Sequence, residues 1–406
     1  MSKLSFPAVS QRVSLPAHME QALALVRAGK LQEASDLLLG GQSASAAPTQ
    51  DAWQAQPLAK TFANFSEQMG QHRPGKAAPI DIADVLAKSG LGRAVPGVGE
   101  KSAGIATPSP DAPGQFQRAA LQHQAQEHAY WLYLPKREAP VGGRALVLML
   151  HGCTQDAQDF ARGTRMNAAA EAQGAVVLYP SQVHSANANG CWNWFRPQDQ
   201  QAGSGEPAML VAMVRQVMAQ HPIDSCRVYV SGLSAGGAMA AVLAQQYPDI
   251  FAAAGVHSGL AAGAAQNMMG ALSAMKSGAK GWDAAPDAGA RQVPLIVFHG
   301  DADTTVHPRN GEQLLEGAVA RLATSVQAKE SGTAPDGQRY TRTMVHDASS
   351  AEPVALAEHW LLHGAGHAWS GGDARGSHAT SQGVNASAEM LRFFGQHAGK
   401  GSTPAP

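Results

Sequence analysis

The stretch VYVSGLSAGGAMAAVLAQQYP, residues 228–248, decides the fold. It joins an apolar, β-rich run to a tight turn around Ser234 and then to an Ala-rich helical segment. Gly232 and Gly236 permit the sharp turn that a serine at its apex requires, and they leave room for neighbouring elements. The pattern therefore predicts a buried strand, a serine pushed toward solvent at a helix N-terminus, and a helix.

Apolar runs of the same form occur on both sides of this stretch. HAYWLYLP (128–135) alternates, whereas RALVLMLHG (144–152), AVVLYPS (175–181) and LIVFHGDAD (295–303) are continuous and stop at turn residues. Helical patterns lie between them, chiefly at 164–173, 206–220, 236–246 and 309–323. This alternation predicts an α/β class with a mostly parallel, doubly wound sheet and helices on both faces. Functional residues of such sheets gather at the carboxyl ends of the strands.

The rest of the 406-residue chain differs in composition. Apolar residues at helical spacing predict an N-terminal helical hairpin over residues 1–40. Residues 41–125 are rich in Ala, Gly, Pro and Ser, which predicts a mostly disordered linker. The α/β domain is expected over 126–397, followed by a disordered tail over 398–406.

Composition limits the classes of partner. Lys and Arg total 30 against 31 Asp and Glu, which argues against a nucleic-acid partner. The chain is 44% hydrophobic without a run long enough to span a membrane. Its start lacks an apolar stretch of signal-peptide length, which predicts a cytoplasmic protein, with an extracellular location as the alternative. Three cysteines are too few for a disulfide framework and lack zinc-site spacing.

A serine at such a turn is a candidate nucleophile. The hydroxyl is weak at neutral pH, so a histidine must accept its proton and a carboxylate must fix that histidine. In this architecture the chain order is Ser, acid, His. The acid candidates are Asp301 and Asp303 in FHGDADTTVHP (298–308), at the end of a predicted strand. Asp301 can cap the turn that Gly300 opens, and Asp303, further into the loop, is favoured without closing the choice.

The candidate bases lie in HWLLHGAGHAWSGG, residues 359–372. His359 and His363 belong to or end a strand-like run, whereas His367 stands in a Gly-flanked loop beyond it. We therefore predict His367 as the general base and expect His363 to end the strand or pack beneath the site.

An oxyanion needs backbone N–H donors. The N–H of Ala235 follows the serine at a helix N-terminus, where the helix dipole favours negative charge. The loop after LVLMLHGCTQ (146–155) supplies the second donor, which we assign to the N–H of Cys153. Cys153 and Cys191 both lie in loops expected at the active edge of the sheet, so a disulfide between them is a further hypothesis.

Several motifs occur in order along residues 151–372: HGCTQ (151–155), GTRMN (163–167), YPSQ (179–182), CWNWF (191–195), GLSAGG (232–237), HGDADTTVHP (299–308) and GHAWSGG (366–372). Together they resemble the polyhydroxybutyrate depolymerase family of esterases. The resemblance implies an α/β-hydrolase fold and a catalytic triad of Ser234, Asp303 and His367. It also implies hydrolysis of poly- or oligo-hydroxyalkanoate esters, with feruloyl and acetyl-xylan esterases as relatives.

The resemblance also marks possible substrate contacts. The family's aromatic motif lies near the cleft, which implies roles for Trp192, Trp194 and Trp369, with packing of the loop shell as the alternative. The expected partner is an ester or polyester, the N-terminal hairpin is a candidate contact to a granule or protein, and no metal or organic cofactor is required. The same triad serves acyltransferases and peptidases, which remain alternatives. A binding module without catalysis is disfavoured because every triad position is filled.

Overall fold

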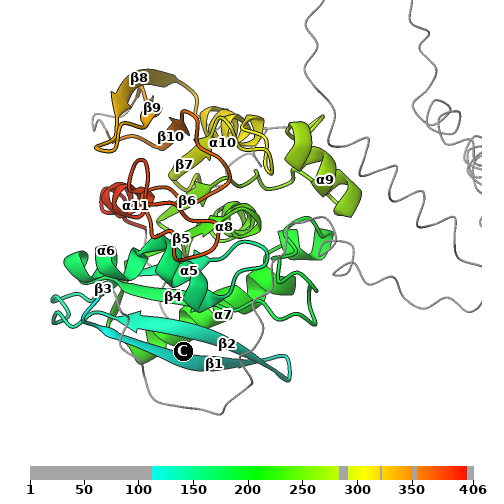
Figure 1. Ribbon diagram of the computed structural model, residues 1–406. Helices are drawn as coiled ribbons and strands as arrows, with labels where there is room; N and C mark the ends of the chain where they lie inside the picture. The colour runs from blue at the N-terminus through cyan, green and yellow to red at the C-terminus, as the bar shows by residue number, and fades with distance from the viewer. Residues whose placement is uncertain (1–111, 283–290, 321, 350–353, 400–406) are drawn as a thin grey trace, which may run out of the picture. The chain divides into compact units, whose positions relative to one another are not determined.

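A computed structural model describes residues 112–282, 291–320, 322–349 and 354–399 (Figure 1). The predicted N-terminal hairpin, residues 41–111 of the predicted linker and residues 400–406 of the predicted tail lie outside this part of the chain.

The described residues form a ten-stranded mixed sheet in the order β1-β2-β4-β3-β5-β6-β7-β10-β9-β8. The central strands from β4 to β10 run parallel, and the pairs at both edges are antiparallel. The strands are β1 (Gln115–His123), β2 (Gln126–Leu134), β3 (Arg144–Leu150), β4 (Val176–Pro180), β5 (Ile223–Leu233), β6 (Ala253–His257), β7 (Leu295–Gly300), β8 (Ser325–Thr333), β9 (Arg339–Asp347) and β10 (Ala357–Leu362).

Helices cover both faces of this sheet (Figure 1). Helices α7 and α8 share a buried cluster with one face, and α5, α6 and α11 share another with the opposite face. Their bounds are α5 (Ala157–Thr164), α6 (Met166–Gln173), α7 (Gly205–Gln220), α8 (Ala235–Gln246), α9 (Met268–Ser277), α10 (Arg309–Val319) and α11 (Ala386–Phe394), with a short 3₁₀ helix at Pro197–Gln200.

Strand β3 shows why its sequence is continuously apolar. Successive side chains of a strand point to opposite faces. Leu146 and Leu148 accordingly join the α7–α8 cluster, whereas Val147 and Met149 join the α5–α6–α11 cluster. All four side chains are fully buried. The prediction of a doubly covered α/β sheet is therefore confirmed.

The domain begins earlier than predicted. Strand β1 (Gln115–His123) lies inside the segment expected to be linker, and it pairs along its whole length with β2. Its polar alternation, QFQRAALQH, buries few side chains and so gives a weak apolar signal. At the other end, Gly399 N–H donates to Cys226 O (2.7 Å), so the first residues of the predicted tail remain attached to the domain.

The predicted helix over 164–173 corresponds to α6, which begins two residues later, and a further helix that was not predicted precedes it. The structure has two helices, α5 and α6, which meet at Arg165 in the left-handed conformation (φ 52°). A single straight helix cannot pass through such a residue. Helix α10 ends at Val319 rather than at 323.

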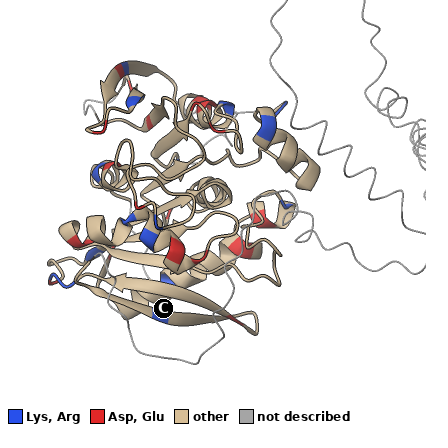
Figure 2. Cartoon of the chain, in the orientation of Figure 1, with Lys and Arg blue, Asp and Glu red and all other residues tan. Residues whose placement is uncertain are grey.

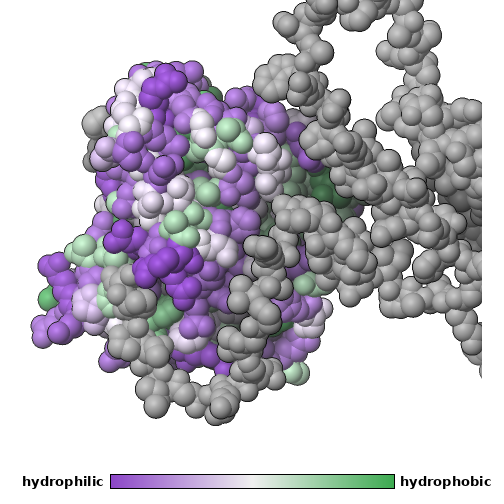
Figure 3. Space-filling view, viewed as in Figure 1, coloured by the Kyte–Doolittle hydropathy of each residue, from purple (hydrophilic) through white to green (hydrophobic). Residues whose placement is uncertain are grey.

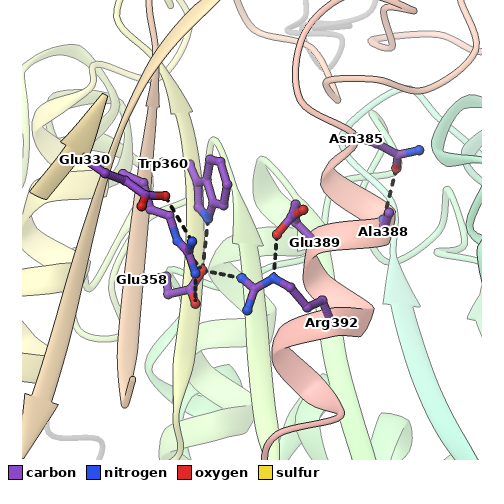
Figure 4. Close-up of polar contacts among 8 residues, drawn as sticks. Glu330, Glu358, Trp360, Asn385, Ala388, Glu389 and Arg392 are labelled. Carbon is purple, nitrogen blue, oxygen red and sulfur yellow. Dashed lines mark hydrogen bonds and ion pairs between the residues drawn. The ribbon is translucent and has the colours of Figure 1, made fainter. Parts of the chain in front are cut away.

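A buried ion-pair cluster centred on Glu358 lies near the β8 edge of the sheet (Figure 4). Glu358 on β10 is 1% exposed, and its carboxylate accepts from Arg342 Nη2 (2.7 Å) and Arg392 Nη2 (2.6 Å). Trp360 Nε1 donates to the same carboxylate (3.1 Å), and Arg342 also lies over the Trp360 ring. Strands β9 and β10 are thereby joined to α11, the helix that follows the loop carrying His367.

The surface of the described part is mixed in character. Acidic and basic residues are interspersed along the cartoon in Figure 2, and polar residues predominate on the face shown in Figure 3. The large exposed apolar side chains include Met268, Met269 and Leu272, all on α9. No helix among the described residues is long and apolar enough to cross a membrane.

Candidate active site

Ser234 stands between β5 and α8 in a strained turn. Its backbone has φ 57° and ψ −119°, a conformation that a residue with a side chain rarely adopts. A Cβ at Gly232 would overlap the backbone of Gly236, and a Cβ at Gly236 would overlap Leu150 O at the end of β3. Both glycines are therefore required because the neighbouring backbone approaches too closely for any side chain. The Ser234 residue itself is 8% exposed.

Asp303 and His367 form a close pair. Their loops follow β7 and β10, two neighbouring parallel strands. His367 Nδ1 lies 2.7 Å from Asp303 Oδ2, and the other carboxylate oxygen accepts from the backbone N–H groups of Thr305 and Val306 (2.9 Å each). The carboxylate is thus held in one orientation, and it can fix both the position and the tautomer of the imidazole.

Asp301 forms a second pair with His363. Asp301 Oδ2 lies 2.8 Å from His363 Nδ1, and Oδ1 accepts from Gly364 N–H (2.7 Å). The far nitrogen of His363 lies 2.9 Å from Thr341 Oγ1 on β9. Since β9 and β5 lie on opposite sides of β10 in the sheet order, this imidazole is directed away from Ser234. The geometry thus favours Asp303 over Asp301 as the acid.

His257, at the end of β6, connects the serine turn to the loop of His367. Its carbonyl accepts from Ser234 N–H (2.9 Å), and its Nε2 accepts from Ser370 N–H (3.2 Å). The ring stacks with Phe298 and with Trp369, at centroid distances of 5.8 and 5.2 Å. The loop 366–372 is therefore connected through His257 to the turn at Ser234, although the strand before this loop, β10, is three places away from β5 in the sheet.

Burial and hydrogen bonding shift the pKa values of this region. Burial would raise the pKa of Asp303, but the hydrogen bond and charge of His367, with the Val306 N–H and His299, hold it below its ordinary value. Burial, followed by the nearby His299 and His367, lowers the pKa of His257 to about 3. Asp303 is therefore ionised and His257 neutral near pH 7.

The predicted oxyanion donors are placed on adjoining elements. Cys153 follows β3, which pairs with β5 on the side opposite β6. A Cβ at Gly152 would lie 3.6 Å from Ser234 Cβ, so this loop runs beside Ser234. Among the hydrogen bonds of the described residues, the N–H groups of Cys153 and Ala235 have no acceptor. Both are thus available to a bound oxygen.

Cys153 and Cys191 form a disulfide that links the loop after β3 to the loop that contains CWNWF (191–195). Cys226 is a free thiol. The three tryptophans marked by the resemblance are nearly inaccessible, with exposures of 0% for Trp192, 5% for Trp194 and 1% for Trp369. Their burial favours the packing alternative, since a side chain without exposed surface offers nothing to a substrate in this conformation.

Sequence reasoning did not assign several residues that shape this site. His151 and Gln155 belong to the HGCTQ motif, but the sequence predicts no separate role for either. Both side chains contact the backbone of Gly152, His151 at its carbonyl oxygen and Gln155 at its N–H. His257 ends a strand, AAGVH, whose small residues resemble no β pattern. No local signal in the sequence marks His257, because its position at the carboxyl end of a central strand is known only from the fold.

The parallel sheet, the strained serine turn and the Asp–His pair define the chain as an α/β-hydrolase. Residues 128–342 match the family model described as Esterase PHB depolymerase, and the chain belongs to this family of carboxylic ester hydrolases.

Individual relatives agree with this assignment. The chain is 37% identical over 180 residues to poly(3-hydroxyalkanoate) depolymerase C of Paucimonas lemoignei, covering 42% of this chain and 43% of the relative. It is 32% identical over 207 residues to feruloyl esterase B of Thermothelomyces thermophilus, covering 47% of this chain and 70% of the relative. The chain thus spans less than half of the depolymerase. The acetyl xylan esterase structure from Aspergillus awamori shares the fold, with a TM-score of 0.51, 21% identity and coverage of 69% of this chain and 99% of that one.

Proposed function

We propose that the protein hydrolyses carboxylic esters by two-step acyl transfer, with Ser234 as nucleophile, His367 as general base and Asp303 as the orienting acid. The observation that carries the proposal is the 2.7 Å contact between His367 and Asp303 on a loop anchored through His257 to the serine turn. Family membership supplies the reaction class.

In the first step Ser234 Oγ attacks the ester carbonyl carbon while His367 Nε2 takes the hydroxyl proton. The carbonyl oxygen becomes an oxyanion, which accepts from the N–H groups of Cys153 and Ala235. The carbon–oxygen bond to the alcohol then breaks, and the alcohol leaves with the proton from His367. A water molecule, deprotonated by His367, then attacks the acyl carbon. The bond from this carbon to Ser234 Oγ breaks, Oγ takes the proton from His367, and the acid is released.

The proposed substrate is a poly- or oligo-(3-hydroxybutyrate) type polyester. Support comes from the family model and from the depolymerase of Paucimonas lemoignei. A feruloyl or acetyl-xylan type ester is the second candidate, because a larger share of feruloyl esterase B is covered.

A substrate panel separates these candidates. Purified protein and Ser234→Ala are compared on 3-hydroxybutyrate oligomers, methyl ferulate and acetylated xylo-oligosaccharides. We expect the highest kcat/KM on the oligomers and no turnover by the variant. A preference for ferulate or acetylated sugar would instead assign the protein to plant-polymer esters.

The disulfide between Cys153 and Cys191 supports an oxidising compartment as the place of action, the alternative to the predicted cytoplasm. Thiols are alkylated in intact cells of the native host before the protein is isolated. Labelling of Cys226 alone would support this location, and labelling of all three cysteines would place the protein in a reducing compartment.

A further inference from the structure

An exposed imidazole, that of His378, lies beside the proposed general base. Its ring centroid is 6.2 Å from that of His367, with an angle of 73° between the ring planes. Among the residues that the structure describes, neither ring nitrogen of His378 has a hydrogen-bond partner. The side chain can therefore bind a ligand without first breaking a hydrogen bond to a described residue.

The backbone holds His378 in a strained conformation. Its φ of 50° lies in the left-handed region, which few residues other than glycine adopt. The carbonyl oxygen of His378 accepts from Trp369 N–H (2.8 Å). The preceding Ser377 N–H donates to the carboxylate of Asp159 (3.1 and 3.2 Å). Backbone strain that surrounding bonds maintain in this way is found mainly at functional sites.

The same bonds connect His378 to two loops of the candidate site. Trp369 belongs to the loop that carries His367. On the other side, Ser377 O accepts from Gln155 Nε2 (2.6 Å), and Gln155 Oε1 accepts from Gly152 N–H (2.9 Å) in the loop after β3. The position of His378 is thus fixed relative to both loops.

The chemistry of the reaction indicates which part of an ester lies near this side chain. In the proposed scheme His367 gives its proton to the leaving alcohol, so the leaving oxygen must lie next to that imidazole. A side chain beside His367 can therefore reach the alcohol moiety. In a poly(3-hydroxybutyrate) chain this moiety is the next repeat unit, which has a carbonyl oxygen a short distance beyond the leaving oxygen. A simple alkyl alcohol has no such acceptor.

The ring of His378 can supply the donor for this oxygen. The surrounding protein removes part of its hydration, and this desolvation, together with the charge of His367, lowers the pKa of His378, whereas Asp159 acts in the opposite direction. The ring is therefore neutral near pH 7. A neutral imidazole has one N–H donor and one acceptor nitrogen.

We propose that His378 is a substrate-binding residue on the alcohol side of the site, where its ring N–H donates to the carbonyl oxygen of the repeat unit that leaves. This inference rests on the proposed function, because it specifies which esters the same site prefers. A site that donates a hydrogen bond to its substrate disfavours an analogue of equal size that lacks the acceptor. His378 should accordingly favour hydroxyacyl alcohols over alkyl alcohols.

Two esters of 3-hydroxybutyric acid test this preference. The alcohol is methyl 3-hydroxybutyrate in the first ester and 2-hexanol, of the same length without the carbonyl group, in the second. We expect His378→Leu to lower kcat/KM about tenfold on the first ester, mainly through KM, and less than about twofold on the second, because only the first loses a hydrogen bond. His378→Gln keeps an amide donor and should stay within about threefold of wild type on both.

The outcomes separate this role from a structural one and from failure of the reaction scheme. Equal losses on the two esters in His378→Leu, no loss on either, or a His378→Gln variant as impaired as His378→Leu would overturn the role of His378. Wild-type protein that hydrolyses neither ester would instead overturn the proposed function. His221→Leu is the control, because His221 lies between α7 and the start of β5, at the opposite end of this strand from Ser234, and both kcat/KM values should be unchanged.

A binding measurement with His378 in place covers the case in which its variants do not fold. ¹⁵N-histidine-labelled Ser234→Ala protein is titrated with each ester, and the ring nitrogen signals are followed by NMR. We expect the His378 signals to shift on addition of the first ester and to change much less with the second. Absence of a shift with the first ester, or equal shifts with both, would contradict the proposal.

Discussion

The Nδ1 atom of His367 lies 2.7 Å from Asp303 Oδ2, and the Asp303 side chain has no exposed surface. Two residues earlier, Asp301 makes a similarly short contact with His363 (2.8 Å), but its side chain is 38% exposed. Two hydrogen-bonded Asp–His pairs therefore stand in the same loop region of the described part of the chain. They differ in burial, and the far nitrogen of His363 contacts Thr341 Oγ1 on β9.

The two carboxylates give a matched pair of substitutions. Asp303→Asn should lower kcat by about 10⁴-fold, because an amide at this position no longer fixes the productive tautomer of His367. Asp301→Asn should lower kcat by less than about tenfold, because it weakens only the contacts to Gly364 and His363, and His363 is directed away from Ser234. Steady-state hydrolysis of p-nitrophenyl butyrate measures both. A larger loss in Asp301→Asn would make His363, rather than His367, the base.

Gly236 tests the packing of the serine turn against β3. In Gly236→Ala the new methyl group would overlap Leu150 O, so the turn must move or the protein must lose stability. We expect a loss of about 1–3 kcal/mol in the free energy of unfolding and a fall in kcat of at least tenfold. Thermal unfolding and ester hydrolysis measure the two effects.

Gly395→Ala is the control for that substitution. Gly395 has helical dihedral angles and only ordinary contacts for an added Cβ. Alanine there should be neutral or slightly stabilising. An unchanged Gly236→Ala enzyme would show that β3 does not pack as closely as described.

The ion-pair cluster around Glu358 should contribute strongly to the free energy of unfolding. Glu358→Gln removes the charge between Arg342 and Arg392 and should destabilise by about 3–5 kcal/mol, because two guanidinium groups lose their shared partner. Glu389→Gln breaks a more exposed pair with Arg392 and should cost less than about 1 kcal/mol. Urea unfolding of both variants gives the comparison. Equal effects would mean that the buried cluster adds little.

Buried histidines should make the protein labile in acid. Burial is the main cause that lowers the pKa of His257 to about 3 and those of His359 and His397 to about 4. Each stays neutral in the folded protein but takes up a proton in the unfolded chain below about pH 6.5. Stability therefore falls as the pH drops from 6.5 toward 4, by about 2 kcal/mol per histidine at pH 5 relative to pH 8.

His359→Leu isolates one of these contributions. His359 Nε2 has no hydrogen-bond partner among the described residues, so the substitution removes no bond from that atom. The difference between the unfolding free energies at pH 8 and pH 5 should shrink by about 2 kcal/mol in the variant. An unchanged difference would mean that His359 is protonated within the folded protein.

The sequence predicted those residues of the site that can be recognised from their immediate neighbours in the chain. Ser234 was identified from the glycines around it and from the strand and helix that flank it. His367 and Asp303 were favoured because each follows a strand-like run into a polar loop. The choice between Asp301 and Asp303 stayed open, because it depends on which histidine lies beside each carboxylate more than sixty residues away along the chain.

The parts that could not be predicted lack a local pattern. Strand β8 is exposed along nearly its whole length, so it has no alternation of buried and polar residues to detect. The hydrogen bond from the backbone N–H of Gln182 to His151 Nε2 joins residues 31 positions apart, which only the folded chain brings together. Tertiary contacts of this kind produce no periodic pattern of residues in a sequence.

Covalent labelling tests the central claim most directly. The protein is treated with a fluorophosphonate at neutral pH, digested, and analysed by mass spectrometry, with Ser234→Ala and Asp303→Asn treated alongside. We predict one adduct, on Ser234, that forms much more slowly in Asp303→Asn and is absent from Ser234→Ala, with ester hydrolysis lost in the same proportion. An adduct on another residue, or hydrolysis that persists in Ser234→Ala, would contradict the account.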